Sequence, residues 1–145
     1  MRKFEKVSYN DTGIIPTRAD KGSAGYDFYT TEKLIIPPKT SIKFCTNIKA
    51  CMEIDEVLVI VVRSSLGMNK KIALSNGTGI IDSSYYNNPE NEGNIMASLY
   101  NYGDVQQEIE AGDRVMQGIF FKYLTVENDT ILNGQRKGGT GSSGN

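Results

Sequence analysis

The sequence predicts an all-β fold, either a β-sandwich or a β-barrel. Short runs rich in β-branched and aromatic residues, separated by Gly, Pro, Asn and Asp, fill most of the chain. No stretch of helical length shows a convincing helical period. Many short strands with frequent turns are typical of these two architectures. The 145 residues suffice for one domain with a sizeable core.

The first strands are expected before residue 52. Residues 26–29 and 34–36 form two apolar runs, and Pro37 and Pro38 end the second of them. Across residues 42–50, apolar residues alternate with polar or smaller ones. This period of two predicts one half-buried strand.

The remaining strands follow in the second half of the chain. Residues 57–62 are continuous and β-branched, so this strand is expected to be covered on both faces. Residues 95–100 and 115–121 predict two further strands, and residues 110–113 predict a tight turn before the last one. Residues 64–68 are expected to form one helical turn with a serine as its N-cap.

The overall composition excludes several classes of function. A net charge of −1 argues against a broad surface for nucleic acid or anionic membrane. The longest apolar run is too short to span a bilayer, and the first residues lack the apolar segment of a signal peptide. Cys45 and Cys51 form neither a metal-binding spacing nor a disulfide framework. We therefore expect a cytoplasmic protein with reduced thiols.

The chain contains no histidine. This excludes Ser-His-Asp and Cys-His nucleophile systems as well as histidine-ligated zinc. Proton transfer near neutral pH is then expected from a carboxylate or another group. A bound metal would be a hard ion held by oxygen atoms, with Mg²⁺ as the first candidate.

The composition changes once along the chain, after Asn133. We expect a β domain over residues 1–133 and a flexible, mostly Gly and Ser tail over residues 134–145, which cannot bury enough apolar surface to fold alone. Such a cationic, glycine-rich segment can wrap a polyphosphate and close over it. A flexible linker or the remnant of an expression tag has the same composition.

Residues 76–86 combine two glycines, one carboxylate and one aromatic ring. The glycines allow a planar ligand to approach the main chain closely. On a strand, Ile81 and Asp82 point to opposite faces, so an anchored Ile81 would direct the carboxylate into a cleft, three residues before Tyr85. An ordinary hairpin with a capping Asp and a surface Tyr is the alternative.

Two earlier segments carry groups suited to phosphate and metal. Asp27 lies at the start of a predicted strand, after a glycine-rich turn. One carboxylate alone is a poor magnesium site, but it can hold a Mg²⁺ ion that takes most of its ligands from water and phosphate. Arg63, Ser64 and Ser65 lie where a strand becomes a helical turn, which is typical of an anion-binding concavity. A turn, an N-cap and a structural ion pair would explain the same residues.

A later segment, residues 112–117, joins a tight turn to a strand. On a regular strand, Arg114 and Met116 would share one face, while Asp113 and Gln117 would share the other with Val115. A Gln in a cleft can orient a water molecule or an oxygen atom. A solvent-exposed turn with one buried amide is the alternative.

The order of these segments resembles the five motifs of the homotrimeric dUTPase family, the deoxyuridine triphosphate nucleotidohydrolases, along nearly the whole chain. The matching segments are residues 24–28, 63–67, 76–85, 112–117 and 136–144. The resemblance implies a jelly-roll subunit, a homotrimer and three active sites at subunit junctions. It also implies hydrolysis of dUTP to dUMP and pyrophosphate with Mg²⁺, which keeps uracil out of DNA and supplies dUMP for dTMP synthesis.

The resemblance further implies a role for each site residue. Asp82 would hold the sugar 3′-hydroxyl and orient or deprotonate the attacking water, and Asp27 would meet Mg²⁺ through water. Tyr85 would pack under the sugar and exclude a ribose 2′-hydroxyl. The pocket for uracil and the nucleoside would be formed by Asn76, Ile80, Ile81 and Met96. The phosphates would be bound by Arg63, Ser64, Ser65 and Gln117. The tail that closes from another subunit would contribute Arg136, Gly138, Gly139, Thr140 and Ser142.

The chain departs from the family pattern at four places. Arg136 lies one residue nearer the glycines than is usual, and Ser65 stands at a position that is often Gly. Thr140 stands where the family usually has an aromatic ring that stacks on uracil, and residues 87–92 resemble an insertion. Two other functions are compatible with the pattern. A dCTP deaminase shares this fold but does not need the closing tail, and it would release ammonia from dCTP. A nucleotide-gated regulatory trimer would bind a protein partner, for which residues 87–92 are the expected surface.

Overall fold

The computed structural model describes residues 1–132 and 134–139. In this part of the chain, nearly all regular structure is β-strand, as predicted, with one six-residue helix and one 3₁₀ turn. The elements are β1 (Lys3–Lys6), β2 (Tyr26–Tyr29), β3 (Leu34–Ile36), β4 (Ser41–Cys45), β5 (Ile48–Cys51), β6 (Glu56–Val62), α1 (Ser64–Asn69), β7 (Ile72–Leu74), β8 (Gly79–Asp82), η1 (Ser83–Tyr85), β9 (Met96–Asn101), β10 (Gln107–Ile109) and β11 (Arg114–Lys122).

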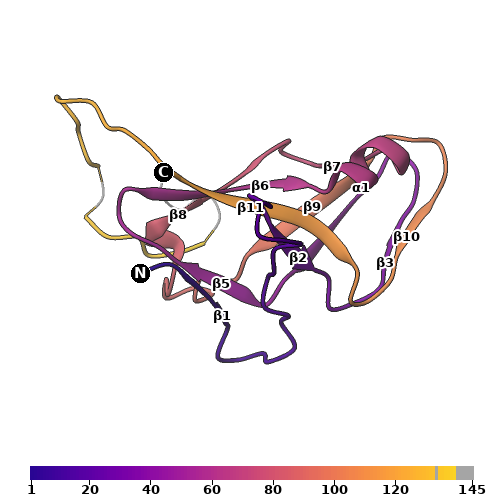
Figure 1. Cartoon of the computed structure of the whole chain (residues 1–145), viewed down its shortest axis with the longest axis horizontal. Helices are drawn as coiled ribbons and strands as arrows, with labels where there is room; N and C mark the ends of the chain where they lie inside the picture. Colours follow the sequence, from indigo (N-terminus) through magenta and orange to yellow (C-terminus); the bar gives the residue numbers. More distant parts are fainter. Residues whose placement is uncertain (133, 140–145) are drawn as a thin grey trace.

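Two sheets enclose the core in a jelly-roll-like arrangement (Figure 1). One has the strand order β2-β11-β6-β8 and the other β4-β9-β7, while β1-β5 and β10-β3 form smaller antiparallel pairs. Large side chains such as Phe28, Leu58, Ile72 and Leu99 are fully buried between them. The predicted all-β fold class is confirmed.

The predicted strand at residues 57–62 forms, but its two faces differ. Leu58 and Ile60 are buried in the core, whereas Val57, Val59 and Val61 on the opposite face are only half-buried. The expectation of cover on both faces is therefore wrong for a single chain. This half-open face, which we call the outer face, becomes important for the site.

The single strand predicted over residues 42–50 is two strands in different sheets. β4 pairs with β9, and β5 pairs with β1. The chain turns between them at Asn47, whose φ is +59°. Asn94 holds this turn, since its Oδ1 accepts the Asn47 backbone N–H at 3.0 Å and its Nδ2 donates to Asn47 Oδ1 at 3.0 Å. The alternation continues across the turn because residues on both sides of it still face the core.

Of three local expectations near the site, two change and one is met. The N-cap of α1 is Arg63, in extended conformation, so Ser64 is the first helical residue and no serine caps the helix. A β-bulge between Arg114 and Met116 shifts the register of β11 against β2, so Val115 and Met116 are both buried and the predicted two-face alternation fails. The predicted turn at residues 110–113 is present, with φ of +86° at Gly112.

The glycine-rich stretch is a crossing between the sheets and not a paired hairpin. β7 pairs with β9, whereas β8 pairs with β6. Between them the chain turns at Gly77, whose φ is +78° and whose N–H donates to the Leu74 carbonyl at 2.8 Å. This crossing leaves the space in which the candidate site lies.

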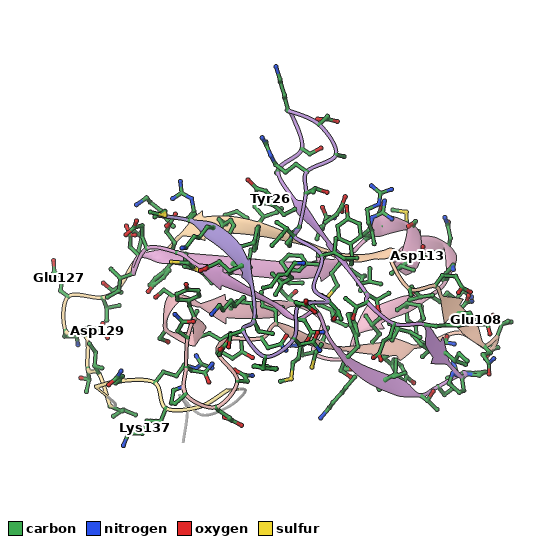
Figure 2. The ribbon with its side chains drawn as sticks, turned by 90° about the horizontal axis from the view of Figure 1, so that it is seen from below. Tyr26, Glu108, Asp113, Glu127, Asp129 and Lys137 are labelled. Carbon is green, nitrogen blue, oxygen red and sulfur yellow. The ribbon has the colours of Figure 1, made fainter. Side chains whose placement is uncertain are left out.

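After β11 the chain leaves the body as an extended arm (Figure 1, orange to yellow). Leu124, Val126, Ile131 and Leu132 in this arm are 66–96% exposed. Figure 2 shows Glu127 and Asp129 of the arm, with Lys137, at the end of the molecule away from Glu108 and Asp113. Among the described residues, no helix is both long and apolar enough to cross a membrane.

Candidate functional site

A cavity of about 280 Å³ lies beside the crossing between β7 and β8. Ile60, Ile81 and Met116 supply apolar walls, and Asn76 and Met96 stand at the same cavity. Four predicted nucleoside-pocket positions are Asn76, Ile80, Ile81 and Met96, and the structure brings all but Ile80 to this cavity. A mostly apolar pocket with a few polar groups suits a small planar ligand.

Ile80 and Asp82 lie on the outer face of the sheet. Their pairing partners on β6 are Val59 and Val57, and directly paired residues share a face. Ile80 is 59% exposed and the Asp82 side chain 51% exposed. Ile81 and Asp82 do point to opposite faces, but within one chain the carboxylate is not directed into the cavity.

Tyr85 is buried, so the alternative of a surface tyrosine is excluded. Its hydroxyl donates to the Asn94 carbonyl at 2.7 Å and accepts from Asn91 Nδ2 at 2.9 Å. Burial raises the pKa of the Tyr85 phenol above its ordinary value, which keeps the hydroxyl protonated as a donor. Two hydrogen bonds therefore fix the hydroxyl end of the Tyr85 ring.

The described part of the tail packs on this same group. The Arg136 guanidinium lies 5.0 Å from the centre of the Tyr85 ring, and its Nη1 is 3.1 Å from Asp82 Oδ2. Arg136 also donates to the carbonyls of Gly138 and Gly139, each at 2.9 Å, and the Gly139 N–H donates to Glu90 Oε2. Thus Asp82, Tyr85 and Arg136 of one chain meet at one place.

A second group of polar residues gathers around Asp27. Arg63 Nε lies 3.6 Å from Asp27 Oδ1, and Arg114 Nη1 lies 3.3 Å from Asp27 Oδ2. Asp27 pairs with Gln117 across β2 and β11, and the bulge in β11 brings Arg114 to the Asp27 carboxylate. Both oxygens of Asp27 therefore have a cationic neighbour.

Gln117 and the two serines complete this group. The Gln117 side chain lies against Gly25, where a Cβ atom would come within 2.5 Å of Gln117 Oε1. Ser64 and Ser65 are exposed at the first turn of α1, directly after Arg63. Hydroxyls, first-turn N–H groups and arginines together form a surface suited to phosphate.

The comparison with known proteins decides the family. The dUTPase family model matches residues 11–144. This chain belongs to the dUTPase family.

Individual dUTPases agree along almost the whole chain. It is 40% identical over 147 aligned residues to the deoxyuridine 5′-triphosphate nucleotidohydrolase of Lactococcus lactis, covering 99% of this chain and 98% of that one. The crystal structure of the Streptococcus mutans dUTPase is similar, with a TM-score of 0.80 and 38% identity, covering 87% of this chain and 99% of that one. A dUTPase from phage phi11 of S. aureus, at 18% identity, a TM-score of 0.75 and coverage of 92% and 97%, shares the fold.

The two polar groups of this dUTPase lie far apart within one chain. Asp82 pairs with Val57 of β6, and Arg63, six residues after Val57, directly follows the end of that strand in extended conformation. Six strand residues span about 20 Å. The 3′-hydroxyl and the α-phosphate of a nucleotide are only a few bonds apart. Along one chain, Asp82 and the serines are therefore farther apart than the 3′-hydroxyl and the α-phosphate of one nucleotide.

Several residues of this site have no signal in the sequence analysis. Lys43, Ser75 and Ser98 line the cavity. Glu90 and Asn91, in the apparent insertion, contact the tail and Tyr85. In the sequence, these residues resemble those of any strand or surface loop. Only their contacts in the folded chain show that they belong to the site. Thr140 and Ser142 lie outside the described residues.

Proposed function

We propose that the protein hydrolyses dUTP to dUMP and pyrophosphate at sites shared between the subunits of a homotrimer. Membership of the dUTPase family supports the reaction. The observation that carries the shared site is the separation of about 20 Å between Asp82 and the Arg63 group along one strand. A second copy must supply the phosphate-binding group to each Asp82.

The apolar surface of the chain supports the same assembly. On the outer face, Ile80 is 59% and Phe121 49% exposed, beside the half-buried Val57 and Val59. The arm adds Leu124, which is 96% exposed. A continuous apolar face of this kind is typical of a surface that another protein covers. A subunit packed on β6 would also give this strand the cover that its sequence predicts.

Each residue set then has a defined task. The cavity takes uracil beside Asn76 and Met96, and Tyr85 packs against the deoxyribose. Asp82 holds the 3′-hydroxyl and accepts a proton from the water that attacks the α-phosphorus. The bond from the α-phosphorus to the bridging oxygen breaks, and pyrophosphate leaves. Positioning and charge neutralisation supply most of such a rate enhancement.

Phosphate binding falls to the other group. Ser64 and Ser65 present hydroxyl and N–H donors, and Gln117 presents its amide. Arg136 contacts Asp82 of its own chain, and it is proposed to reach the phosphates at a site of another subunit when the tail closes. Thr140 and Ser142 of the tail are proposed to add donors when it closes. Removal of dUTP would keep uracil out of DNA, and the dUMP formed would supply dTMP synthesis.

Asp27 is proposed to meet Mg²⁺ through water. Its two oxygens are already next to Arg63 and Arg114, and no group of three or more Cys, Asp or Glu in residues 1–132 and 134–139 is placed to hold a metal. This donor set fits a hydrated ion that takes its inner ligands from phosphate, and it does not fit a protein-enclosed ion. The phage phi11 relative coordinates a structural Mg(II) ion. When bound, the ion would neutralise charge on the phosphates.

A pyrophosphate-release assay across dUTP, dTTP, UTP and dCTP tests the reaction. We expect release from dUTP, with far lower kcat/KM for the other three nucleotides. Ammonia release from dCTP without pyrophosphate release from dUTP would replace the hydrolase with a deaminase. A pull-down with and without dUTP tests the regulatory alternative, which stays a prediction, as does the cytoplasmic location.

A further inference from the structure

The apparent insertion, residues 87–92, is an ordered loop built around the Tyr85 main chain. The Asn87 N–H donates to the Glu92 carbonyl at 2.7 Å, which closes the loop. Asn88 is 4% exposed, and its Nδ2 donates to the Tyr85 carbonyl at 2.8 Å. Its Oδ1 accepts from the backbone N–H groups of Glu90 and Asn91. The loop is therefore part of the folded body next to Tyr85.

Asn91 lies at the centre of this loop, with its amide orientation fixed by its neighbours. Its Oδ1 accepts from Asn88 Nδ2 at 2.7 Å and from the Gly93 N–H at 3.0 Å. Because this oxygen has two donors, the Nδ2 group must face the other way, toward the Tyr85 hydroxyl at 2.9 Å. The Asn91 side chain thus joins the loop to the tip of the Tyr85 ring.

Contacts with the rest of the chain hold the loop in place. Lys49 Nζ donates to Asn87 Oδ1 at 2.7 Å, and the Ser8 N–H donates to Glu92 Oε2 at 2.7 Å. Tyr9 donates its hydroxyl to the Asn91 carbonyl at 3.3 Å. These partners lie on β5 and on the segment after β1, so the loop is a rigid support and not a free surface insertion.

We propose that Asn91 is a positioning residue for sugar selection, acting through the Tyr85 hydroxyl. This inference rests on the proposed role of Tyr85 against the deoxyribose. The ring is held by its own backbone at one end and by Asn91 and Asn94 at the other. A ring fixed at both ends cannot tilt to admit a 2′-hydroxyl. With the Asn91 donor lost, the ring gains freedom and ribonucleotides are excluded less strongly.

Asn91→Asp tests the proposal, because it keeps the two accepted hydrogen bonds and replaces the Nδ2 donor by an acceptor. The Tyr85 hydroxyl has one proton and can then no longer bond both residue 91 and the Asn94 carbonyl. Asn87→Asp is the matched control: it makes the same change in the same loop and does not touch Tyr85. For Asn91→Asp we expect the ratio of kcat/KM for dUTP to that for UTP to fall about tenfold, the effect of one lost hydrogen bond. The ratio for Asn87→Asp should stay at the wild-type value, and both melting temperatures should stay close to it.

A double-mutant cycle with Tyr85→Phe separates positioning from general loop damage. Since Asn91 acts through the hydroxyl, Asn91→Asp should change the dUTP-to-UTP ratio no further in the Tyr85→Phe background. An unchanged ratio in Asn91→Asp, or additive effects in the cycle, would overturn the proposal. If Asn91→Asp does not fold, Tyr85→Phe alone removes the same bond, and a wild-type ratio there is equally contrary.

Tyr85→Ala separates the role of Tyr85 in sugar selection from the positioning role of Asn91. If this variant keeps the wild-type preference for dUTP, the sugar role of Tyr85 itself is wrong. If Tyr85→Ala loses the preference while Asn91→Asp keeps it, only the positioning role of Asn91 fails.

Discussion

Asp82 is the residue whose surroundings differ most between the free chain and the proposed enzyme. In the chain it is half exposed and paired with Arg136. Its proposed catalytic role therefore depends on the groups that another subunit and the substrate bring next to it.

Replacement of Asp82 by Asn should preserve nucleotide binding and remove the base. We expect turnover to fall by about 10²–10⁴-fold, since a positioned general base contributes that much. Asp104→Asn, on a side chain that is 91% exposed, is the control and should retain full turnover. Pyrophosphate release and dUTP-analogue binding measure the two effects. Wild-type turnover in Asp82→Asn would remove Asp82 from the mechanism.

A second residue-scale prediction concerns the pair formed by Tyr86 and Glu5. The Tyr86 hydroxyl donates to Glu5, which raises the pKa of Tyr86 to about 12 and lowers the pKa of Glu5 below its usual value. The folded state gains from ionised Glu5 above its ordinary pKa, and this gain is lost as pH falls through the lowered value. The contribution of protonated Tyr86 is present below its ordinary pKa of 10 and is lost as pH rises toward about 12.

Glu5→Gln should therefore return the pKa of Tyr86 toward its ordinary value of 10. An alkaline titration of tyrosinate absorbance measures this shift, and Tyr86→Phe identifies the transition that belongs to this residue. Glu127→Gln, in the exposed arm, is the control and should leave the titration unchanged. An unaltered curve in Glu5→Gln would contradict the pairing.

The sequence predicts individual residues better than their partners. Asp82 and Tyr85 are recognisable because their spacing after two glycines matches a known motif. Nothing in the sequence shows that Asn91 reaches the Tyr85 hydroxyl, because Asn, Pro and Glu in one short segment are typical of any surface loop. The contact exists only because Asn88 folds the loop back on the Tyr85 carbonyl.

At the scale of elements, the existence of strands is predictable and their pairing is not. Residues 42–50 keep an inward-outward alternation although the chain changes sheets at Asn47. The crossing from β7 to β8 resembles a hairpin because glycines in a turn between apolar runs signal both. Alternation reports which side chains face the core, and it carries no information on which strand lies alongside.

Gly93 follows the insertion loop, residues 87–92, and its substitution tests how tightly the chain packs there. It has a φ of +91°, and a Cβ atom would lie 2.6 Å from the Tyr85 carbonyl oxygen. Gly112 has a similar φ of +86° with nothing nearby. We expect Gly112→Ala to cost about 1–2 kcal/mol of unfolding free energy from backbone strain alone. Gly93→Ala should cost clearly more, since backbone atoms must also move.

Urea denaturation of both variants measures the difference. Equal midpoints for the two would show that the contact between Gly93 and Tyr85 has no energetic weight.

For the whole molecule, the separation of Asp82 from the Arg63 group makes a prediction about mixed oligomers. Asp82→Asn removes the base, and Ser64→Asp places a negative charge where phosphates bind. Each variant alone should be inactive. When the two chains are coexpressed, some sites join an intact Asp82 from one chain to an intact Ser64 from another, so activity should reappear. A site within one chain would carry a defect in every subunit and stay inactive.

The sequence does predict that the molecule is an all-β protein, and the continuous β-branched run of β6 predicts cover on both faces. A single chain provides only half of that cover. The contradiction disappears when the outer face is treated as an interface. The sequence pattern thus agrees with the proposed assembly, but the separation of Asp82 from the Arg63 group followed only from the register of β8 against β6.

In the chain without nucleotide, the Arg136 guanidinium covers the Tyr85 ring. A nucleoside that packs on this ring, as proposed, would require the guanidinium to move away from it. Entry and exit then become an exchange between a side chain and a nucleotide.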